Sequence, residues 1–433
     1  MRKGVVVACA LTAALTCGCS TQSETPTYRV LQEDKIINAD MWDQSPRMMA
    51  AGLGFTQIIG IPGLTTDNTS LSKSLVALAG GTWNTVTCAN GQTPQLSNYT
   101  SAATPDGIAK TYGQDVYYSD GLPVEFSWPL LPSTLTGSDF AVMLNNGQVI
   151  TPQVASIYPN FEYNERSVAV LFGHFGNRID PTKPGALYPV SIAVVNGGTE
   201  LKLVGPNAKI VSAVGMSAKA PGSPYTDPSV PPDKRGGPRL VGAKLSVMST
   251  VGDTGPKAFD QNLPNDGVTL YGDQAQYRLR VYTTGGMTPD GVRGMYPTDF
   301  SRFFKLVAKS DNGNNVAIVE ANHDYTIDGQ SLRVVGLADL GKKQDSYDDC
   351  YGDDKDNYID IVLSGSKVAV SKITTVYMPS TGKYSPVYNP GGPGNNPAPG
   401  VRYSAPSAPI SQPVTNALDD PLTVTYPADA KAE

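Results

Sequence analysis

The segment from Lys342 to Asp360 concentrates carboxylates that could bind a cation. Seven of its residues are aspartates, and the only basic residue after Lys343 is Lys355. Calcium prefers roughly six to eight oxygen ligands. Several of these could come from one loop through Asp353, Asp354, Asp356, Asn357 and Asp360. We therefore expect either a calcium site formed by these five residues or a solvated acidic loop.

The chain has only two histidines, His174 and His323, for acid–base chemistry. His174 follows an apolar run, in a segment whose glycines allow a sharp turn and which also contains Arg178. His323 precedes Asp324, whose carboxylate could orient the imidazole, although adjacent strand residues point to opposite faces. These four residues form the candidate pocket, and packed or solvated loop side chains are the alternative. A zinc site with three histidines is excluded.

The N-terminus has the layout of a secretory signal. Arg2 and Lys3 precede an apolar run, Val5–Leu15, that is too short to span a bilayer as a helix. The run ends in the sequence LTCGCS, in which Gly18 precedes Cys19. This sequence resembles the lipobox of bacterial lipoproteins, where a small residue precedes the cysteine that becomes lipid-modified.

The resemblance implies a signal peptide over residues 1–18 and lipid attachment at Cys19. It also implies a bacterial envelope protein that is anchored in a membrane and faces the periplasm or the cell exterior. Several acyl chains would anchor it firmly, because each buried methylene contributes about 0.8 kcal/mol. The alternative is an ordinary cleaved signal that releases a secreted protein.

Five cysteines are present, of which Cys9 and Cys17 lie in the predicted signal and Cys19 carries the predicted lipid. Cys88 and Cys350 remain as the only pair, and an even number suits an oxidising compartment. A disulfide between them would require the two distant regions to pack together. Two separate buried thiols are the alternative.

The remaining sequence is mainly β in character. Pro123–Trp128 alternates apolar and polar residues, as expected for a half-buried strand, and the turn Asn145–Gly147 separates two further apolar runs as a hairpin. Phe300–Val307 has helical spacing for at most one turn. Between Lys219 and Leu240 the six prolines exclude regular structure, and the 55 residues from Pro379 contain eleven more.

These patterns predict two antiparallel β-sandwich domains, immunoglobulin-like in layout, with a Pro-rich linker and tail. The expected boundaries are 19–110 for an N-terminal region of uncertain fold, 111–218 for the first sandwich, 219–240 for the linker or loop, 241–378 for the second sandwich, and 379–433 for a largely flexible tail. Within that tail, Leu422–Tyr426 alternates well enough to add one strand to a neighbouring sheet.

Charge and composition limit the partners. The formal charge is −6, and removal of the signal with Arg2 and Lys3 gives −6 − 2 = −8. Nucleic acid is therefore not an expected partner, because phosphate binding needs clustered basic residues. The 22 tyrosines suit recognition of a protein or carbohydrate ligand, and they equally suit β-sheets. The candidates for exposed tyrosines are Tyr347, Tyr351, Tyr358, Tyr384, Tyr388 and Tyr403.

Two functions fit these observations. The leading one is a non-enzymatic binding or structural module of the envelope, because the chain has only two histidines. The alternative is a metal-assisted hydrolase of envelope or extracellular material, which would use the acidic Asp345–Asp360 loop with a histidine nearby. No cofactor is expected apart from calcium. The two functions predict different arrangements of residues. The enzyme needs the acidic loop and a histidine in one concave pocket, and the binding module does not.

Overall fold

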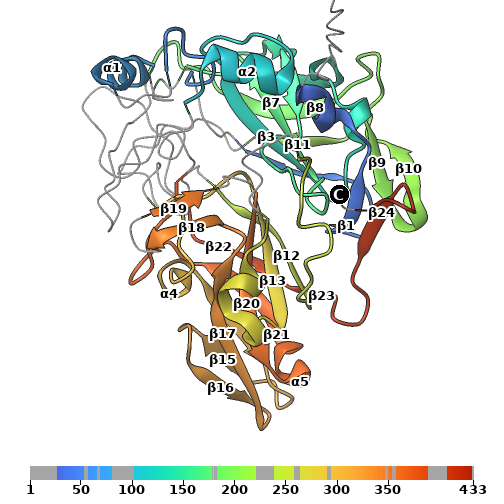
Figure 1. Cartoon of the computed structure of the whole chain (residues 1–433), viewed down its shortest axis with the longest axis vertical. Helices are drawn as coiled ribbons and strands as arrows, with labels where there is room; N and C mark the ends of the chain where they lie inside the picture. The colour runs from blue at the N-terminus through green and yellow to red at the C-terminus, as the bar shows by residue number, and fades with distance from the viewer. Residues whose placement is uncertain are drawn as a thin grey trace, which may run out of the picture.

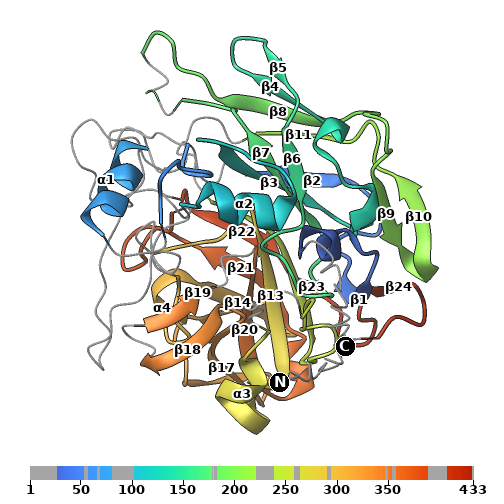
Figure 2. The same cartoon turned by 45° about the horizontal axis from the view of Figure 1, so that its top comes forward.

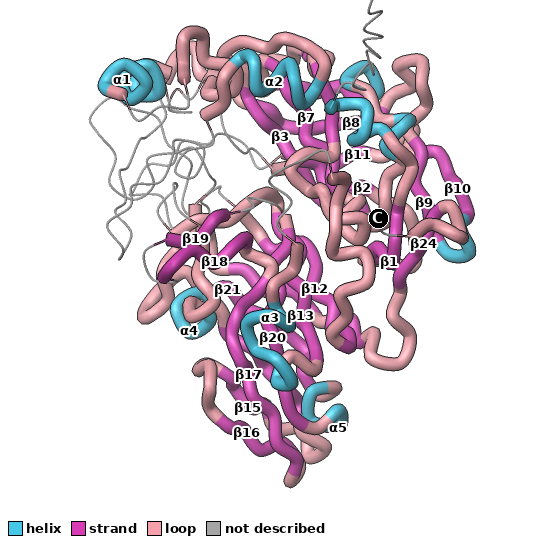
Figure 3. The backbone as a smooth tube through the Cα atoms, in the orientation of Figure 1, coloured by secondary structure: helices cyan, strands magenta, loops and turns pink. Residues whose placement is uncertain are grey.

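The chain is mainly β and forms two antiparallel sandwich domains, as the sequence predicts (Figure 1). The computed structural model describes residues 27–52, 57–65, 69–79, 102–177, 179, 183–220, 238–257, 264–289, 294–346, 350–353, 357–388 and 407–431. Strands run through both domains and the helices are short (Figure 3).

The first domain contains two four-stranded sheets with a shared core. Their strand orders are β2-β3-β7-β6 and β11-β8-β4-β5, and the pairs β9–β10 and β1–β24 lie beside them (Figure 2). Its strands are β1 (Ile36–Asp40), β2 (Met48–Ala51), β3 (Asp120–Phe126), β4 (Phe140–Leu144), β5 (Val149–Ile150), β6 (Val154–Ser156), β7 (Val168–Gly173), β8 (Pro189–Val194), β9 (Lys202–Gly205), β10 (Lys209–Ser212), β11 (Ser217–Lys219) and β24 (Thr423–Tyr426).

The helices of the first domain are η1 (Thr27–Gln32), α1 (Ser70–Leu78), α2 (Pro105–Tyr112), η3 (Pro132–Thr134), η4 (Gly137–Asp139) and η5 (Pro206–Ala208). Local sequence explains the limits of α2. The Thr104 hydroxyl accepts a hydrogen bond from the Gly107 amide, and Pro105 occupies the first turn. Gly113 ends the helix at φ 71°, in the left-handed region that favours glycine.

The second domain packs a six-stranded sheet on a four-stranded one. The strand orders are β16-β17-β20-β13-β12-β23 and β15-β14-β21-β22, and β18–β19 form a separate hairpin. Its elements are β12 (Leu240–Val247), α3 (Gly267–Tyr271), η7 (Gly272–Gln274), β13 (Tyr277–Thr283), α4 (Phe300–Phe303), β14 (Lys305–Lys309), β15 (Asn315–Ile318), β16 (Asp324–Ile327), β17 (Gln330–Ala338), β18 (Gly341–Ser346), β19 (Cys350–Asp353), β20 (Tyr358–Gly365), α5 (Lys367–Val370), β21 (Ile373–Met378), β22 (Ile410–Pro413) and β23 (Thr415–Asn416).

The predicted hairpin around Asn145–Gly147 is confirmed by the pairing of β4 with β5, and α4 is the single predicted helical turn. The predicted half-buried strand is β3, which is buried along its whole length. The difference arises because both faces of its sheet are covered. Leu122 and Val124 face the core of the first domain. On the opposite face of the same sheet, Val168 and Val170 pack in a cluster with Tyr282 and Tyr358 of the second domain.

The expected flexible tail needs correction for residues 407–431. Strand β22 pairs with β21 and β23 pairs with β12, both in the second domain. The predicted strand at Leu422–Tyr426 is confirmed as β24, which returns to the first domain and pairs with β1. In Figure 1 the red β24 lies beside the blue β1. The N-terminal region of uncertain fold contributes β1 and β2 to the first domain.

Within the described ranges, no helix is both long enough and apolar enough to cross a membrane.

Candidate functional site

The predicted lipid and disulfide sites fall largely outside the described residues. Cys19 and Cys88 both lie outside the described residues. Cys350 begins β19, and its side chain is not described. Lipid attachment and the Cys88–Cys350 disulfide therefore stay predictions.

The five predicted calcium ligands are only partly described. Asp354 and Asp356 lie outside the described residues, and Asp353 ends β19 with a side chain that is not described. Asn357 and Asp360 are at most 2% exposed. Asn357 Nδ2 donates to Glu125 Oε1 over 3.0 Å and to the Thr283 carbonyl over 2.9 Å.

Asp360 is likewise engaged with protein groups. Its Oδ1 accepts from Arg280 Nε over 2.8 Å, and its Oδ2 accepts from Asn265 Nδ2 over 2.6 Å. In the part of the chain that the structure describes, no three His, Cys, Asp or Glu side chains are arranged to hold a metal ion. The calcium site stays a prediction that rests on the remaining aspartates.

The structure does not bring the two histidines together. His174 follows β7 in the first domain, whereas His323 precedes β16 in the second, and both are exposed. Figure 1 shows these two strands in the upper and lower parts of the molecule. Arg178 lies outside the described residues.

Asp324 has a partner other than the neighbouring histidine. Its two carboxylate oxygens accept from Arg333 Nε and NH2 over 2.8 and 2.7 Å. These hydrogen bonds hold the pKa of Asp324 below its usual range. The ring of His323 instead packs edge-on against Tyr325, with 4.7 Å between ring centroids.

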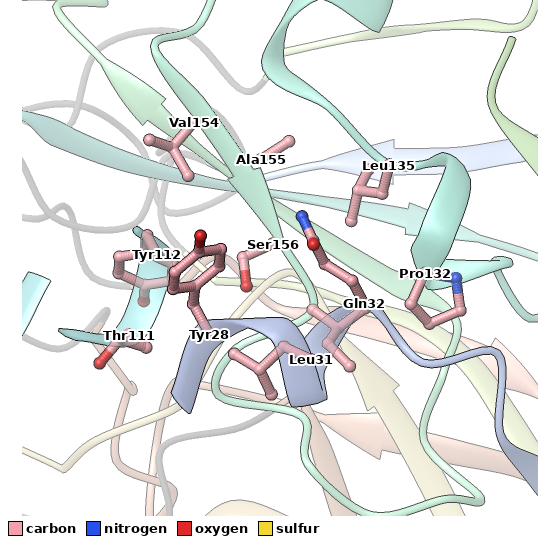
Figure 4. Close-up of a pocket in the computed structure, with 11 residues that line it drawn as sticks. Tyr28, Leu31, Gln32, Thr111, Tyr112, Pro132, Leu135, Val154, Ala155 and Ser156 are labelled. Atoms are coloured by element: carbon pink, nitrogen blue, oxygen red, sulfur yellow. The ribbon is translucent and has the colours of Figure 1, made fainter. Parts of the chain in front are cut away.

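A hollow of about 290 Å³, including the space open to solvent, lies between η1, α2 and β6 (Figure 4). Its enclosed part is only about 30 Å³, far smaller than ordinary ligand pockets of roughly 300–1,000 Å³. Its lining includes neither histidine and no residue of the acidic segment. The lining residues are Tyr28, Leu31, Gln32, Thr111, Tyr112, Pro132, Leu135, Val154, Ala155, Ser156 and Ile157.

Two of the tyrosines expected to be exposed are buried. Tyr358 is 2% exposed and Tyr388 is 5% exposed. The phenol ring of Tyr358 stacks on that of Tyr282, with 5.1 Å between centroids, and Tyr282 stacks on Trp42 over 4.6 Å. Tyr282 also donates its hydroxyl proton to the Ser167 carbonyl over 2.8 Å. These rings form part of the contact between the two domains.

The unexpected feature of the molecule is a buried set of charged side chains beside these rings. We call it the joint cluster, and none of its members is more than 4% exposed. The first domain supplies Asp40, Glu162, Glu165 and Arg166, and the second supplies Lys244, Asp253, Arg278, Arg280, Asp339 and Asp360.

Strand periodicity places the second-domain members on one face of their sheet. Along β13, Leu279 and Val281 point into the core of the domain, so Arg278, Arg280 and Tyr282 point away from it. In the register of the sheet, Arg280 lies opposite Lys244 on one side and Asp360 on the other. The polar face of this sheet therefore meets the first domain instead of solvent.

Arg280 lies at the centre of the joint cluster. Its guanidinium contacts Asp339 and Asp360 of its own domain at 2.6 and 2.8 Å. It also lies 3.4 Å from Asp40 Oδ2 and 3.5 Å from Glu165 Oε1, both in the first domain. Burial lowers the pKa of Arg280, but these four carboxylates outweigh it and raise the pKa well above its usual value.

Lys244 makes a second contact between the domains. Its Nζ lies 2.6 Å from Asp40 Oδ1 and donates to the Leu422 carbonyl, just before β24, over 2.7 Å. Burial raises the pKa of Asp40, but Lys244, Arg278 and Arg280 together bring it down to about 2. Asp40 is therefore ionised at neutral pH and pairs with all three cations.

Close approach of the two domains also requires a small residue at position 242. A Cβ atom at Gly242 would lie 2.8 Å from the Trp42 ring, nearer than side chains normally pack. The only sequence signal for this whole contact was the alternation of Arg and Tyr with Leu and Val in β13, which is equally typical of a solvent-facing strand. Sequence reasoning identified Asp360 and missed its partners for this reason.

Comparisons with known proteins add little. No protein-family model matches the chain, and no curated protein does. A solved structure, a tetra-tandem repeat in the extending region of a large adhesion protein, is 10% identical over 72% of this chain and 71% of that one. Its TM-score is 0.12, which carries no argument about fold or function.

Proposed function

We propose that this chain is a secreted, lipid-anchored protein of the bacterial envelope that acts as a non-enzymatic structural or binding module. The anchor rests on the LTCGCS sequence around Cys19. The observation that supports a structural module most directly is Arg280, which binds carboxylates of both domains while 1% exposed. Charged groups that are buried and directed at one another have no access to a substrate. They do fix the orientation of the domains that supply them.

Such a fixed orientation is not the usual behaviour of two linked domains, which move relative to each other unless their interface is large and apolar. Here the apolar part is supplied by Trp42, Tyr282 and Tyr358, and the joint cluster adds directional contacts beside it. A rigid two-domain unit would present its surface at a constant distance from the membrane, as a structural or binding module requires.

Small-angle X-ray scattering of the purified chain at neutral pH tests the rigid unit. We expect wild type to scatter as one compact particle and Arg280→Met to show a larger radius of gyration. The matched control is Arg333→Met, because Arg333 pairs with Asp324 at a site where the two side chains are 34% and 65% exposed. If Arg280→Met and Arg333→Met both scatter like wild type, Arg280 does not fix the two domains.

The anchor is tested separately by fractionation of cells that express the chain. We expect Cys19→Ser to move the protein from the membrane fraction to the soluble fraction. Cys17→Ser is the matched control, since it changes a neighbouring thiol and should leave the protein in the membrane. Release by both variants, or by neither, would contradict lipid attachment at Cys19.

The proposal includes a protein or carbohydrate ligand. Among the described tyrosines, Tyr117 and Tyr118 stand side by side just before β3 and are 48% and 44% exposed. Exposed phenol rings stack on sugars and fill protein pockets. We expect Tyr117→Ala/Tyr118→Ala to weaken binding to purified envelope glycans about ten-fold, whereas Val149→Ala, at a site 59% exposed, should bind like wild type. Equal binding by the double variant would exclude this pair.

A further inference from the structure

The joint cluster contains more acids than bases. Its acids are Asp40, Glu162, Glu165, Asp253, Asp339 and Asp360, and its bases are Arg166, Lys244, Arg278 and Arg280. Six carboxyl groups less four cations leave two negative charges in excess if every group is ionised. Buried charge without compensation is costly, and a carboxyl group avoids this cost by taking up a proton.

Nearby groups show which carboxyls would hold these protons. Asp40 lies within about 4 Å of three cations and Asp360 within about 4 Å of two. Among the described side chains, Asp339 forms an ion pair with Arg280 alone. Asp40 and Asp360 are therefore the acids whose ionised forms are most favoured. Glu162 instead hydrogen-bonds the carboxyl group of another acid, Glu165, which requires a proton on one of the two, and Asp339 is also near. Arg166 is the cation near Glu162, but its NH1 donates to the backbone carbonyls of Asn160 and Glu162.

Asp339 is in a mixed environment. Arg280 lies 2.6 Å away and Arg278 is near, but Asp360 and Asp253 repel a charge on its carboxyl group. Burial raises the pKa of Asp339 to about 7 and the pKa of Glu162 well above its usual value. Burial also raises the pKa of Asp253. It raises the pKa of Glu125 as well, which lies outside the cluster and accepts a hydrogen bond from Asn357.

We propose that protons help to close the joint between the two domains: Glu162 and Asp339 hold protons near neutral pH, and their loss in alkali loosens the joint. Each step is a simple ionisation, in which the carboxyl group transfers its proton to water or hydroxide and leaves an additional buried negative charge. The inference rests on the proposed rigid unit and adds a pH range over which rigidity holds.

The direction of the pH effect follows from linkage. An acid whose pKa is higher in the folded state binds more protons there, so its stabilising contribution is complete below the unfolded pKa. The contribution falls as pH rises through the folded pKa. For Asp339 this range runs from about 4 to about 7. Unfolding near pH 6 should therefore release about one proton from Asp339, and the excess of two acids over bases in the cluster predicts about two protons in total.

The experiment measures wild type, Glu162→Gln and Asp339→Asn from pH 5 to pH 9. The amides resemble protonated carboxyl groups but cannot ionise. We expect the radius of gyration of wild type to rise between pH 7 and pH 9 and that of the double variant to stay constant. Each single variant should lower the number of protons released on unfolding by about one, which reduces the slope of the unfolding free energy with pH. Asp324→Asn, an exposed change of the same type, should behave like wild type.

If the amide variants fail to fold, calorimetry of wild type in buffers of different ionisation enthalpy still counts the protons released on unfolding. Because Glu125 outside the cluster can release one proton of its own, release of more than one proton near pH 6 supports the inference, and release of one or none overturns it. If the radius of gyration of wild type stays constant up to pH 9 and its stability does not depend on pH, the inference about protons is wrong. The proposed rigid unit would still hold in that case. Loose domains at every pH would instead overturn the proposed function.

Discussion

Replacing Lys244 by methionine should strongly destabilise the fold, because Asp40 would lose its nearest cation. The two groups are 2.6 Å apart and their side chains are 2% and 3% exposed. At an effective dielectric constant of about 20, their attraction is on the order of 6 kcal/mol. Removal of one partner from a buried pair typically costs about 3–5 kcal/mol. Arg280 and Arg278 stay within 3.4 and 3.9 Å of Asp40, which favours the lower value, about 3 kcal/mol.

The assay is urea unfolding followed by circular dichroism, with thermal unfolding in parallel. A loss of about 3 kcal/mol should lower the unfolding temperature by roughly 6–12 °C for domains of this size. The matched control is Lys367→Met, because Lys367 pairs with Asp419 at 2.5 Å with side chains 49% and 88% exposed. An exposed pair is worth about 1 kcal/mol or less. If both variants lose the same small amount of free energy of unfolding, the buried pair does not stabilise the joint.

Three further outcomes are expected. Gly242→Ala should lower the free energy of unfolding by about 1–3 kcal/mol in urea titrations, because the added carbon would meet the Trp42 ring, and an unchanged midpoint would contradict that close contact. The pKa of Asp40 is lowered to about 2, so its ionised form contributes about 2 kcal/mol to the free energy of unfolding. This contribution is complete above about pH 4 and is lost as the pH falls towards 2. Urea titrations of an Asp40→Asn variant should lack this acid-dependent part. Calcium should raise the unfolding temperature of wild type but not of Asp354→Asn/Asp356→Asn, and no heat in calorimetric titration of wild type would remove the predicted metal site.

The sequence predicts the sandwiches well because their signals are local. The turn at Asn145–Gly147 and the alternation at Pro123–Trp128 need no knowledge of the rest of the chain. Leu422–Tyr426 also alternates, so a strand was predictable there. Its partner was not, because nothing in the strand itself indicates whether it pairs with a neighbour or with β1.

The joint cluster was unpredictable for a different physical reason. A polar strand face normally meets water, and Arg278 and Arg280 carry no mark that distinguishes a domain contact from solvent. Their burial depends on Asp40, which is more than two hundred positions earlier in the chain. The acidic segment was noticed for its composition, but Asp360 pairs with Arg280 in the adjacent strand, and composition does not give strand register.

The pairing of β1 with β24 has a consequence for biosynthesis. Ile36 pairs with Tyr426, so the first domain needs a strand that is made after nearly all of the second domain. Translation at roughly 5–20 residues per second delays that strand by about 20–80 s after Ile36. During this interval β1 lacks its partner strand and has an exposed edge. A chain with this connectivity completes its first domain only after its second domain has been made. Export of the chain before it folds is compatible with this order.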